Sequence, residues 1–176
     1  MEKPLKKIVI LGPESTGKST LTQSLAAHFS APWVREYARE YLESLDRPYD
    51  YPDLLEIAKG QIALEKEMES RAENFLFCDT NLLVIEVWSQ HKFGKTDQWI
   101  LETLQKREYD FILLTDIDIP WQDDPQREHP EPKMREYFFN LYFQKIEASK
   151  TPFAVVSGPP EKRFALALEK IQNLLS

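Results

Sequence analysis

Short apolar runs alternate along this chain with longer stretches in which apolar residues recur at the spacing of an α-helix. Each short run holds four to six residues, which is the usual length of a β-strand. The predicted strands are residues 7–11, 33–36, 75–79, 110–115 and 153–156.

The longer stretches place their apolar residues on one face, which predicts amphipathic helices. The predicted helices are residues 16–29, 53–71, 82–88, 100–107, 131–149 and 161–175. Alternation of strands and helices is typical of an α/β fold. We therefore expect a three-layer architecture, with a five-stranded parallel sheet covered by helices on both faces.

Length and composition fit one globular domain, residues 1–176. Hydrophobic residues make up 42% of the chain and aromatic residues 12%, which suffices for a core. The net charge of −7 comes from 22 basic and 29 acidic side chains. This balance speaks against binding to nucleic acid, because phosphate backbones are held by surplus Lys and Arg. Cys78 is the single cysteine, so neither an intramolecular disulfide nor a cysteine-based metal cluster can form.

No apolar stretch has the length that secretion or membrane insertion requires. The first apolar run holds about five residues, whereas a signal peptide needs roughly seven to fifteen and a membrane span roughly twenty. We therefore expect a cytoplasmic protein that contacts no membrane.

Residues 120–132 depart from the alternation. They contain four prolines and a cluster of charges between the fourth strand and the next helix. A polar loop of this length in a compact domain is commonly a lid or a disordered insert, and a lid is the interpretation we follow. A solvated connection is the alternative.

Residues 12–19, with the sequence GPESTGKS, fit the phosphate-binding motif G-x-x-x-x-G-K-[ST]. The motif stands where its chemistry requires, between an apolar strand and an amphipathic helix. Its glycines let the backbone curl, so that successive N–H groups point at phosphate oxygens, and the helix adds the positive end of its dipole. The sequence therefore predicts a P-loop fold that binds ATP.

Individual roles follow from the motif. Lys18 reaches the outer phosphates, Ser19 ligates Mg²⁺, and Thr20 supports the loop or approaches the inner phosphate. We also expect two residues outside the motif, Arg135 and Gly158, to contact the nucleotide. The full set of nucleotide-binding candidates is Gly12, Pro13, Glu14, Ser15, Thr16, Gly17, Lys18, Ser19, Thr20, Arg135 and Gly158.

Acidic residues that close predicted strands are candidates for the metal. Asp79 ends the third strand and is the preferred partner of Ser19 for Mg²⁺ or for the acceptor hydroxyl. Asp116 and Asp118 follow the fourth strand, where we expect them to start the lid loop and cap local backbone.

Glu36 ends the second predicted strand, where its carboxylate could accept a proton from an attacking hydroxyl or bind a ribose. A surface salt bridge is the alternative. Arg127 and Arg135 lie in and just after the lid, and a closing arginine stabilises the charge that phosphoryl transfer spreads over three oxygens. Gly158 to Arg163 could wall the adenine, or could simply form a turn and a helix start.

Four blocks of the chain together resemble the nicotinamide riboside kinase domain of NadR-type proteins, within the P-loop kinases. The blocks are residues 12–21, 35–39, 78–81 and 120–127. The resemblance implies a nucleotide-kinase-like fold and ATP-dependent phosphorylation of the ribose 5′-hydroxyl of nicotinamide riboside. It implies Lys18, Glu36, Asp79 and Arg127 as catalytic residues. The implied acceptor site is Glu36, Tyr37, Arg39, Asp79, Asn81 and Trp121.

The chain also departs from that family. NadR-type proteins carry an adenylyltransferase domain and often a helix-turn-helix, and 176 residues hold neither, so we expect no NAD synthesis or repression. Arg35 replaces an aromatic residue that stacks on the base in some members, and Asn81 stands where Asp is common. The aromatic surface would then come from Trp33, Tyr37, Tyr41 or Trp121.

Two further hypotheses remain open from the residues alone. One is a kinase of the same fold for another nucleoside or nucleotide. The other is a regulatory P-loop NTPase that acts through a protein partner.

Overall fold

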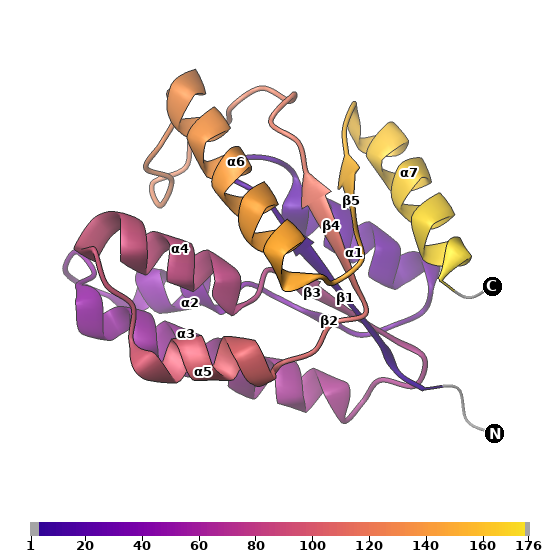
Figure 1. The fold of residues 1–176 in the computed structure, drawn as a ribbon, viewed down its shortest axis with the longest axis horizontal. Helices are drawn as coiled ribbons and strands as arrows, with labels where there is room; N and C mark the ends of the chain where they lie inside the picture. Colours follow the sequence, from indigo (N-terminus) through magenta and orange to yellow (C-terminus); the bar gives the residue numbers. More distant parts are fainter. Residues whose placement is uncertain (1–3, 175–176) are drawn as a thin grey trace.

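The computed structural model describes residues 4–174 and contains one parallel five-stranded sheet in the order β2-β3-β1-β4-β5 (Figure 1). The strands are β1 (Lys6–Leu11), β2 (Trp33–Val34), β3 (Phe75–Asp79), β4 (Phe111–Thr115) and β5 (Phe153–Val156). Every neighbouring pair runs parallel. All five predicted strands are present, and the predicted parallel sheet is confirmed.

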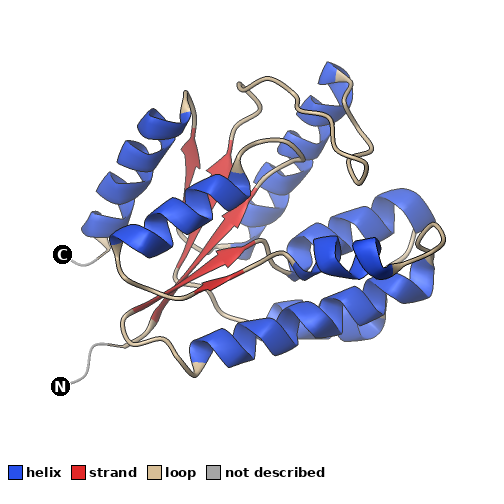
Figure 2. Ribbon diagram, turned by 180° about the vertical axis from the view of Figure 1, so that it is seen from behind, coloured by secondary structure: helices blue, strands red, loops and turns tan. Residues whose placement is uncertain are grey.

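Seven helices connect and flank these strands within the described residues. They are α1 (Lys18–His28), α2 (Tyr37–Ser44), α3 (Tyr51–Glu69), α4 (Leu82–Phe93), α5 (Gln98–Lys106), α6 (Pro132–Ser149) and α7 (Pro160–Asn173). Helices α1 and α7 cover one face of the sheet, whereas α3, α4 and α6 pack on the other (Figures 1 and 2). The predicted three layers are confirmed.

Alternating side chains of the central strand divide the core between the two faces. In β1, Ile8 and Ile10 belong to the cluster under α1 and α7, whereas Val9 and Leu11 belong to the cluster under α4 and α6. All four are fully buried. A strand buried on both faces must be apolar at every position, which is why β1 appears in the sequence as an uninterrupted apolar run.

A third apolar cluster joins α2, α3, α4 and α5 beside the sheet. Helix α2 was not predicted, because its sequence YAREYLES is dominated by polar and aromatic residues and buries only Ala38. Tertiary packing holds this helix in place: the Tyr37 ring lies so close to Gly60 that a Cβ there would be 2.0 Å from Cε1. The amide N–H of Tyr37 also donates to the side chain of Gln61 on α3 (2.8 Å).

Several predicted helix ends move by a few residues. Helix α1 begins at Lys18 rather than at 16, because the phosphate loop continues through Gly17, which has φ +76°. Helix α4 runs on to Phe93 and stops at the left-handed Gly94. The predicted end of the last helix at Leu175 lies outside the described residues.

Residues 120–131 form no regular structure, and α6 begins at Pro132, so the predicted lid segment is an extended loop. Within residues 4–174, none of the helices combines the length and apolar character that crossing a bilayer would take.

Candidate active site

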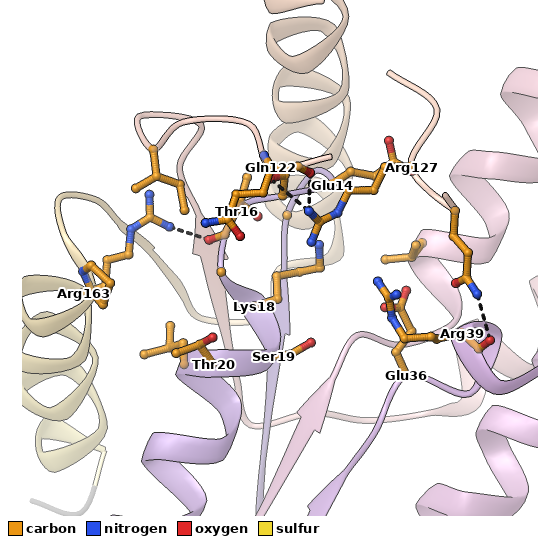
Figure 3. Close-up of a pocket in the computed structure, with 18 of the residues that line it drawn as sticks. Glu14, Thr16, Lys18, Ser19, Thr20, Glu36, Arg39, Gln122, Arg127 and Arg163 are labelled. Carbon is orange, nitrogen blue, oxygen red and sulfur yellow. Dashed lines mark hydrogen bonds between the residues drawn. The ribbon is translucent and has the colours of Figure 1, made fainter. Parts of the chain in front are cut away.

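A cavity of about 450 Å³ lies at the carboxyl ends of the strands (Figure 3). Its floor is the loop after β1 and the first turns of α1. One end is closed by α7 and the other by α2, α4 and α6, while the loop of residues 120–131 lies above. Ligands of parallel α/β sheets bind at this edge, where the strand order reverses beside β1.

The phosphate loop is held open by close backbone packing and left-handed residues. A Cβ on Gly12 would lie 2.1 Å from Thr115 Oγ1, so only glycine fits against β4. Thr16 Oγ1 donates to Pro13 O (2.7 Å) and lies 2.6 Å from Thr115 Oγ1. Ser15 has φ +57° and Gly17 φ +76°. These conformations turn successive amides toward one side, as an anion site requires.

Lys18 begins α1 and reaches back across this loop, where its Nζ donates to Pro13 O (2.8 Å). Burial lowers the pKa of Lys18, and the charges of Glu36, Asp79 and Glu14 oppose that effect. The ammonium therefore lies over the loop, where the charges of three carboxylates act on it, and it lies close to Arg127 in Figure 3.

Ser19 and Asp79 form the predicted metal pair. Ser19 Oγ donates to Asp79 Oδ2 (2.5 Å), and Asp79 Oδ1 is buried without a hydrogen-bond partner in the structure. Burial raises the pKa of Asp79. An orphaned carboxylate oxygen beside a hydroxyl fits a hard divalent cation, although no set of three His, Cys, Asp or Glu side chains among residues 4–174 could hold a metal unaided. This pair suits Mg²⁺, which keeps several waters and takes further oxygens from substrate phosphates.

Glu36 follows β2, precedes α2 and lines the cavity, and its carboxylate makes no hydrogen bond or ion pair with another of the described residues. Burial raises the pKa of Glu36 to about 7, with Lys18 opposing and Asp79 adding to the shift. The surface salt bridge considered as an alternative is made instead by its neighbour: the exposed Arg35 pairs with Glu40. Glu36 is thus left free for chemistry inside the cavity.

The loop of residues 120–131 is tied to the phosphate loop beneath it. The N–H of Gln122 donates to Ser15 Oγ (2.8 Å), and the Glu14 carboxylate accepts from the N–H groups of Glu128 (3.1 Å) and His129 (3.2 Å). Arg127 Nη1 donates to Gln122 O (2.5 Å) and points into the cavity toward Lys18 (Figure 3). The loop thus brings a guanidinium over the phosphate site.

Arg39 joins this loop to α2. Its Nη1 donates to Asp124 Oδ2 (2.8 Å), and Gln126 Nε2 donates to its carbonyl (3.2 Å). Arg39 lines the cavity, as do all the loop candidates from Gly12 to Thr20 except Pro13, which contributes only its carbonyl.

Six other predicted residues do not line the cavity, and each has another contact; one of them is Asp79, which accepts from the Ser19 hydroxyl. Tyr37 packs on Gly60, and Asn81 accepts from the N–H of Leu83 (3.0 Å) as the cap of α4. Trp121 donates to Asp123 (2.9 Å), and the guanidinium carbons of Arg127 and Arg135 lie 6.0 Å and 5.8 Å from the centre of its ring. Arg135 binds backbone carbonyls behind the phosphate loop, and Gly158 N–H donates to Asp118.

Asp116 and Asp118 cap local backbone, as expected. Asp116 Oδ1 accepts from the N–H of Ile117 (2.7 Å), and Asp118 pairs with Arg163 as well as Gly158. Gly158 to Arg163 form a turn and the start of α7, and Pro160, Arg163 and Phe164 line one end of the cavity.

The structure adds an aromatic compartment that sequence reasoning missed. Leu42 of α2, Val84 and Trp88 of α4, and Tyr142 of α6 line the end of the cavity beyond Glu36. The aromatic residues expected there, Trp33, Tyr37, Tyr41 and Trp121, are absent from its lining. Trp88 and Tyr142 lie on apolar helix faces, and nothing in their spacing separates them from core residues.

Comparison with known proteins agrees with this geometry. Residues 7–163 match the family model AAA_28, described as an AAA domain. The chain belongs to this family. It is also 25% identical to the trifunctional NAD biosynthesis/regulator protein NadR of Escherichia coli (strain K12), over 97% of this chain and 43% of that protein. The AAA-domain chain thus spans less than half of this relative, and the resemblance to NadR seen in the sequence is confirmed.

This AAA-domain chain shares its fold with solved structures of NadR and of nucleoside kinases. A NadR protein in complex with NAD and AMP-PNP is 22% identical, with a TM-score of 0.76 over 96% of this chain and 49% of that one. A deoxyadenosine kinase from M. mycoides is 16% identical, with a TM-score of 0.65 over 95% of this chain and 99% of that one. The expected nucleotide-kinase-like fold is confirmed.

Proposed function

We propose that the protein is an ATP-dependent kinase that phosphorylates the ribose 5′-hydroxyl of nicotinamide riboside. The observation that carries the proposal is the cavity itself. It joins a phosphate loop at one end to an aromatic compartment at the other, with the unpaired carboxylate of Glu36 between them. A hydroxyl bound beside Glu36 would face the terminal phosphate of a nucleotide on the loop.

The chemistry follows from that placement. Glu36 accepts the proton of the 5′-hydroxyl as its oxygen forms a bond to the γ-phosphorus, and the bond from phosphorus to ADP breaks. Lys18 and Arg127 stabilise the charge on the equatorial oxygens. Ser19 and Asp79 would hold Mg²⁺, which would neutralise part of the negative charge of the nucleotide phosphates.

The electrostatics of the aromatic compartment support a cationic base. Burial first, and then the negative charges of Glu36 and Glu14, raise the pKa of Tyr142, so two carboxylates act on this end of the cavity. The nicotinamide ring of the riboside carries a positive charge, and the indole of Trp88 offers a face for it. The similarity to NadR, and to a NadR protein solved in complex with NR, supports the same acceptor.

A neutral nucleoside is the second candidate, favoured by the match to nearly the whole length of the deoxyadenosine kinase. A regulatory NTPase has less support, because it needs no second compartment.

A panel of acceptors with Mg-ATP separates the three. Phosphate on nicotinamide riboside, at a rate well above that on adenosine, deoxyadenosine or thymidine, supports the proposal. Preference for a neutral nucleoside overturns the choice of acceptor. Release of free phosphate at a rate that no acceptor changes overturns the proposal that the protein is a kinase.

A further inference from the structure

Two buried arginines lie behind the phosphate loop. Arg135 belongs to the first turn of α6 and Arg163 to the first turn of α7, and they are 9% and 3% exposed. The positive end of a helix dipole is an unfavourable place for a cation. Compensating contacts must therefore hold each guanidinium there.

Those contacts are mostly backbone carbonyls. Arg135 donates to Ser15 O (3.2 Å) and Ile119 O (3.0 Å). Arg163 donates to Thr16 O (2.8 Å), Gly158 O (2.7 Å) and Asp116 O (2.9 Å), and it pairs with Asp118. The bond from Arg163 to Thr16 is drawn in Figure 3. The two arginines thus bind consecutive carbonyls of the phosphate loop.

A peptide unit is planar and trans, so its C=O and N–H point in opposite directions. The carbonyl of Ser15 shares its plane with the N–H of Thr16, and the carbonyl of Thr16 shares its plane with the N–H of Gly17. An arginine that holds the oxygen outward therefore aims the N–H inward. Arg135 orients the amide of Thr16 in this way, and Arg163 orients the amide of Gly17.

The loop needs such support because its backbone is unfavourable. Ser15 adopts φ +57°, a left-handed conformation that costs a residue with a Cβ free energy. Thr16 Oγ1 holds the front of the loop through Pro13 and Thr115, but no side chain other than the two arginines binds the carbonyls of Ser15 and Thr16 among residues 4–174.

We infer that Arg135 and Arg163 are positioning residues that preorganise the amides of Thr16 and Gly17 and thereby set the affinity for the triphosphate. The inference rests on the nucleotide site of the proposed function and goes beyond it, since neither arginine needs to touch the nucleotide. Burial first, and then the charge of Arg163, lower the pKa of Arg135, so the two guanidiniums repel each other. An anion in the loop in front of them relieves that repulsion.

Arg135→Lys and Arg163→Lys test the inference, because lysine keeps the charge but lacks the forked donors. Calorimetry with Mg-AMP-PNP, and separately with Mg-tripolyphosphate, measures the affinity. We expect each variant to bind both ligands about tenfold more weakly, the effect of one lost charge-assisted hydrogen bond. Unchanged affinity for both ligands in folded variants overturns the inference. A loss confined to AMP-PNP also overturns it, because it would assign the arginine to the adenine.

Arg107→Lys is the matched control. Arg107 is also a largely buried arginine, 15% exposed, and it pairs with Glu65 and Glu69 beside α3 rather than at the loop. The Arg107→Lys variant should have a lower Tm and an unchanged affinity for both ligands. If it weakens both as much as the loop variants do, general destabilisation explains the effect and the inference fails. No acceptor enters these titrations, so their failure would leave the proposed acceptor untouched.

Discussion

The two ends of the cavity are built in different ways. The phosphate end comes from one continuous segment, residues 12–20, between β1 and the first turn of α1. The acceptor end is assembled from residues far apart in the chain, with Glu36 after β2, Trp88 on α4 and Tyr142 on α6. A site formed by consecutive residues can be recognised from a sequence motif, whereas a site assembled from distant residues can be recognised only once the fold is known.

This difference also separates the expected effects of mutation. Changes at the phosphate end should affect every reaction of the protein, whatever the acceptor. Changes at the acceptor end should alter the choice and affinity of the acceptor and leave nucleotide binding intact.

Lys18→Ala should have the largest effect. Without the ammonium over the loop, the transferring phosphate loses a direct positive charge, and we expect kcat/KM to fall about 10⁴-fold with every acceptor. Steady-state kinetics measure it, with Lys59→Ala on the exposed surface of α3 as the control. A loss for one acceptor alone would contradict the uniform role of the phosphate end.

Glu36→Gln should come next, because the amide cannot accept the proton of the hydroxyl. We expect kcat to fall about 10³-fold while the affinity for Mg-AMP-PNP stays within about twofold. The control is Glu40→Gln, whose carboxylate is exposed and pairs with Arg35. If the Glu36 variant retains full turnover, Glu36 is not the base.

Arg127→Ala should lower kcat about 100-fold and weaken ATP binding less, since its charge matters most when the phosphate transfers. Arg35→Ala is the control, because Arg35 lies outside the cavity. Turnover equal to that of the unmodified protein would refute the role assigned to Arg127.

Trp88→Ala should raise the KM for nicotinamide riboside about tenfold, the size of one lost stacking contact, with the KM for ATP unchanged. Trp99→Ala removes a partly buried indole from α5 outside the cavity and should leave both KM values alone. An increase in the KM for ATP would contradict the division of the cavity into two ends.

The pH profile should show the smallest effect. Burial raises the pKa of Glu36 to about 7, and the reaction needs its deprotonated form. We therefore expect kcat/KM to rise about fourfold between pH 6.5 and pH 8 and then to level.

The same carboxylate should make stability depend on pH. The pKa of Glu36 is higher in the folded protein than its ordinary value of about 4.5, so ionisation of Glu36 lowers the free energy of unfolding as pH rises from about 4.5 through 7. Glu36→Gln should accordingly have a higher Tm than the unmodified protein at pH 8 but not at pH 4, and thermal melts at both values check this.

The fold was predictable from the chain because strand and helix periods are local. All five strands and every predicted helix are present, and α2 alone was missed, since it depends on Gly60 and Gln61 of α3. At the site, the phosphate loop joins β1 to α1 and Ser19 bonds to Asp79, as the sequence predicted. Glu36 and Arg127 line the cavity, but Glu36 precedes α2 instead of ending β2, which stops at Val34. Trp88 and Tyr142 were not predictable, because helix faces that line a cavity and those that pack in a core share one apolar pattern.

The most direct test of the central claim is ³¹P NMR of the protein with Mg-ATP and nicotinamide riboside. We expect a new monoester resonance coupled to the 5′ protons of the ribose, formed in step with ADP and absent with Lys18→Ala. Inorganic phosphate as the sole product, formed equally fast without the riboside, would contradict it.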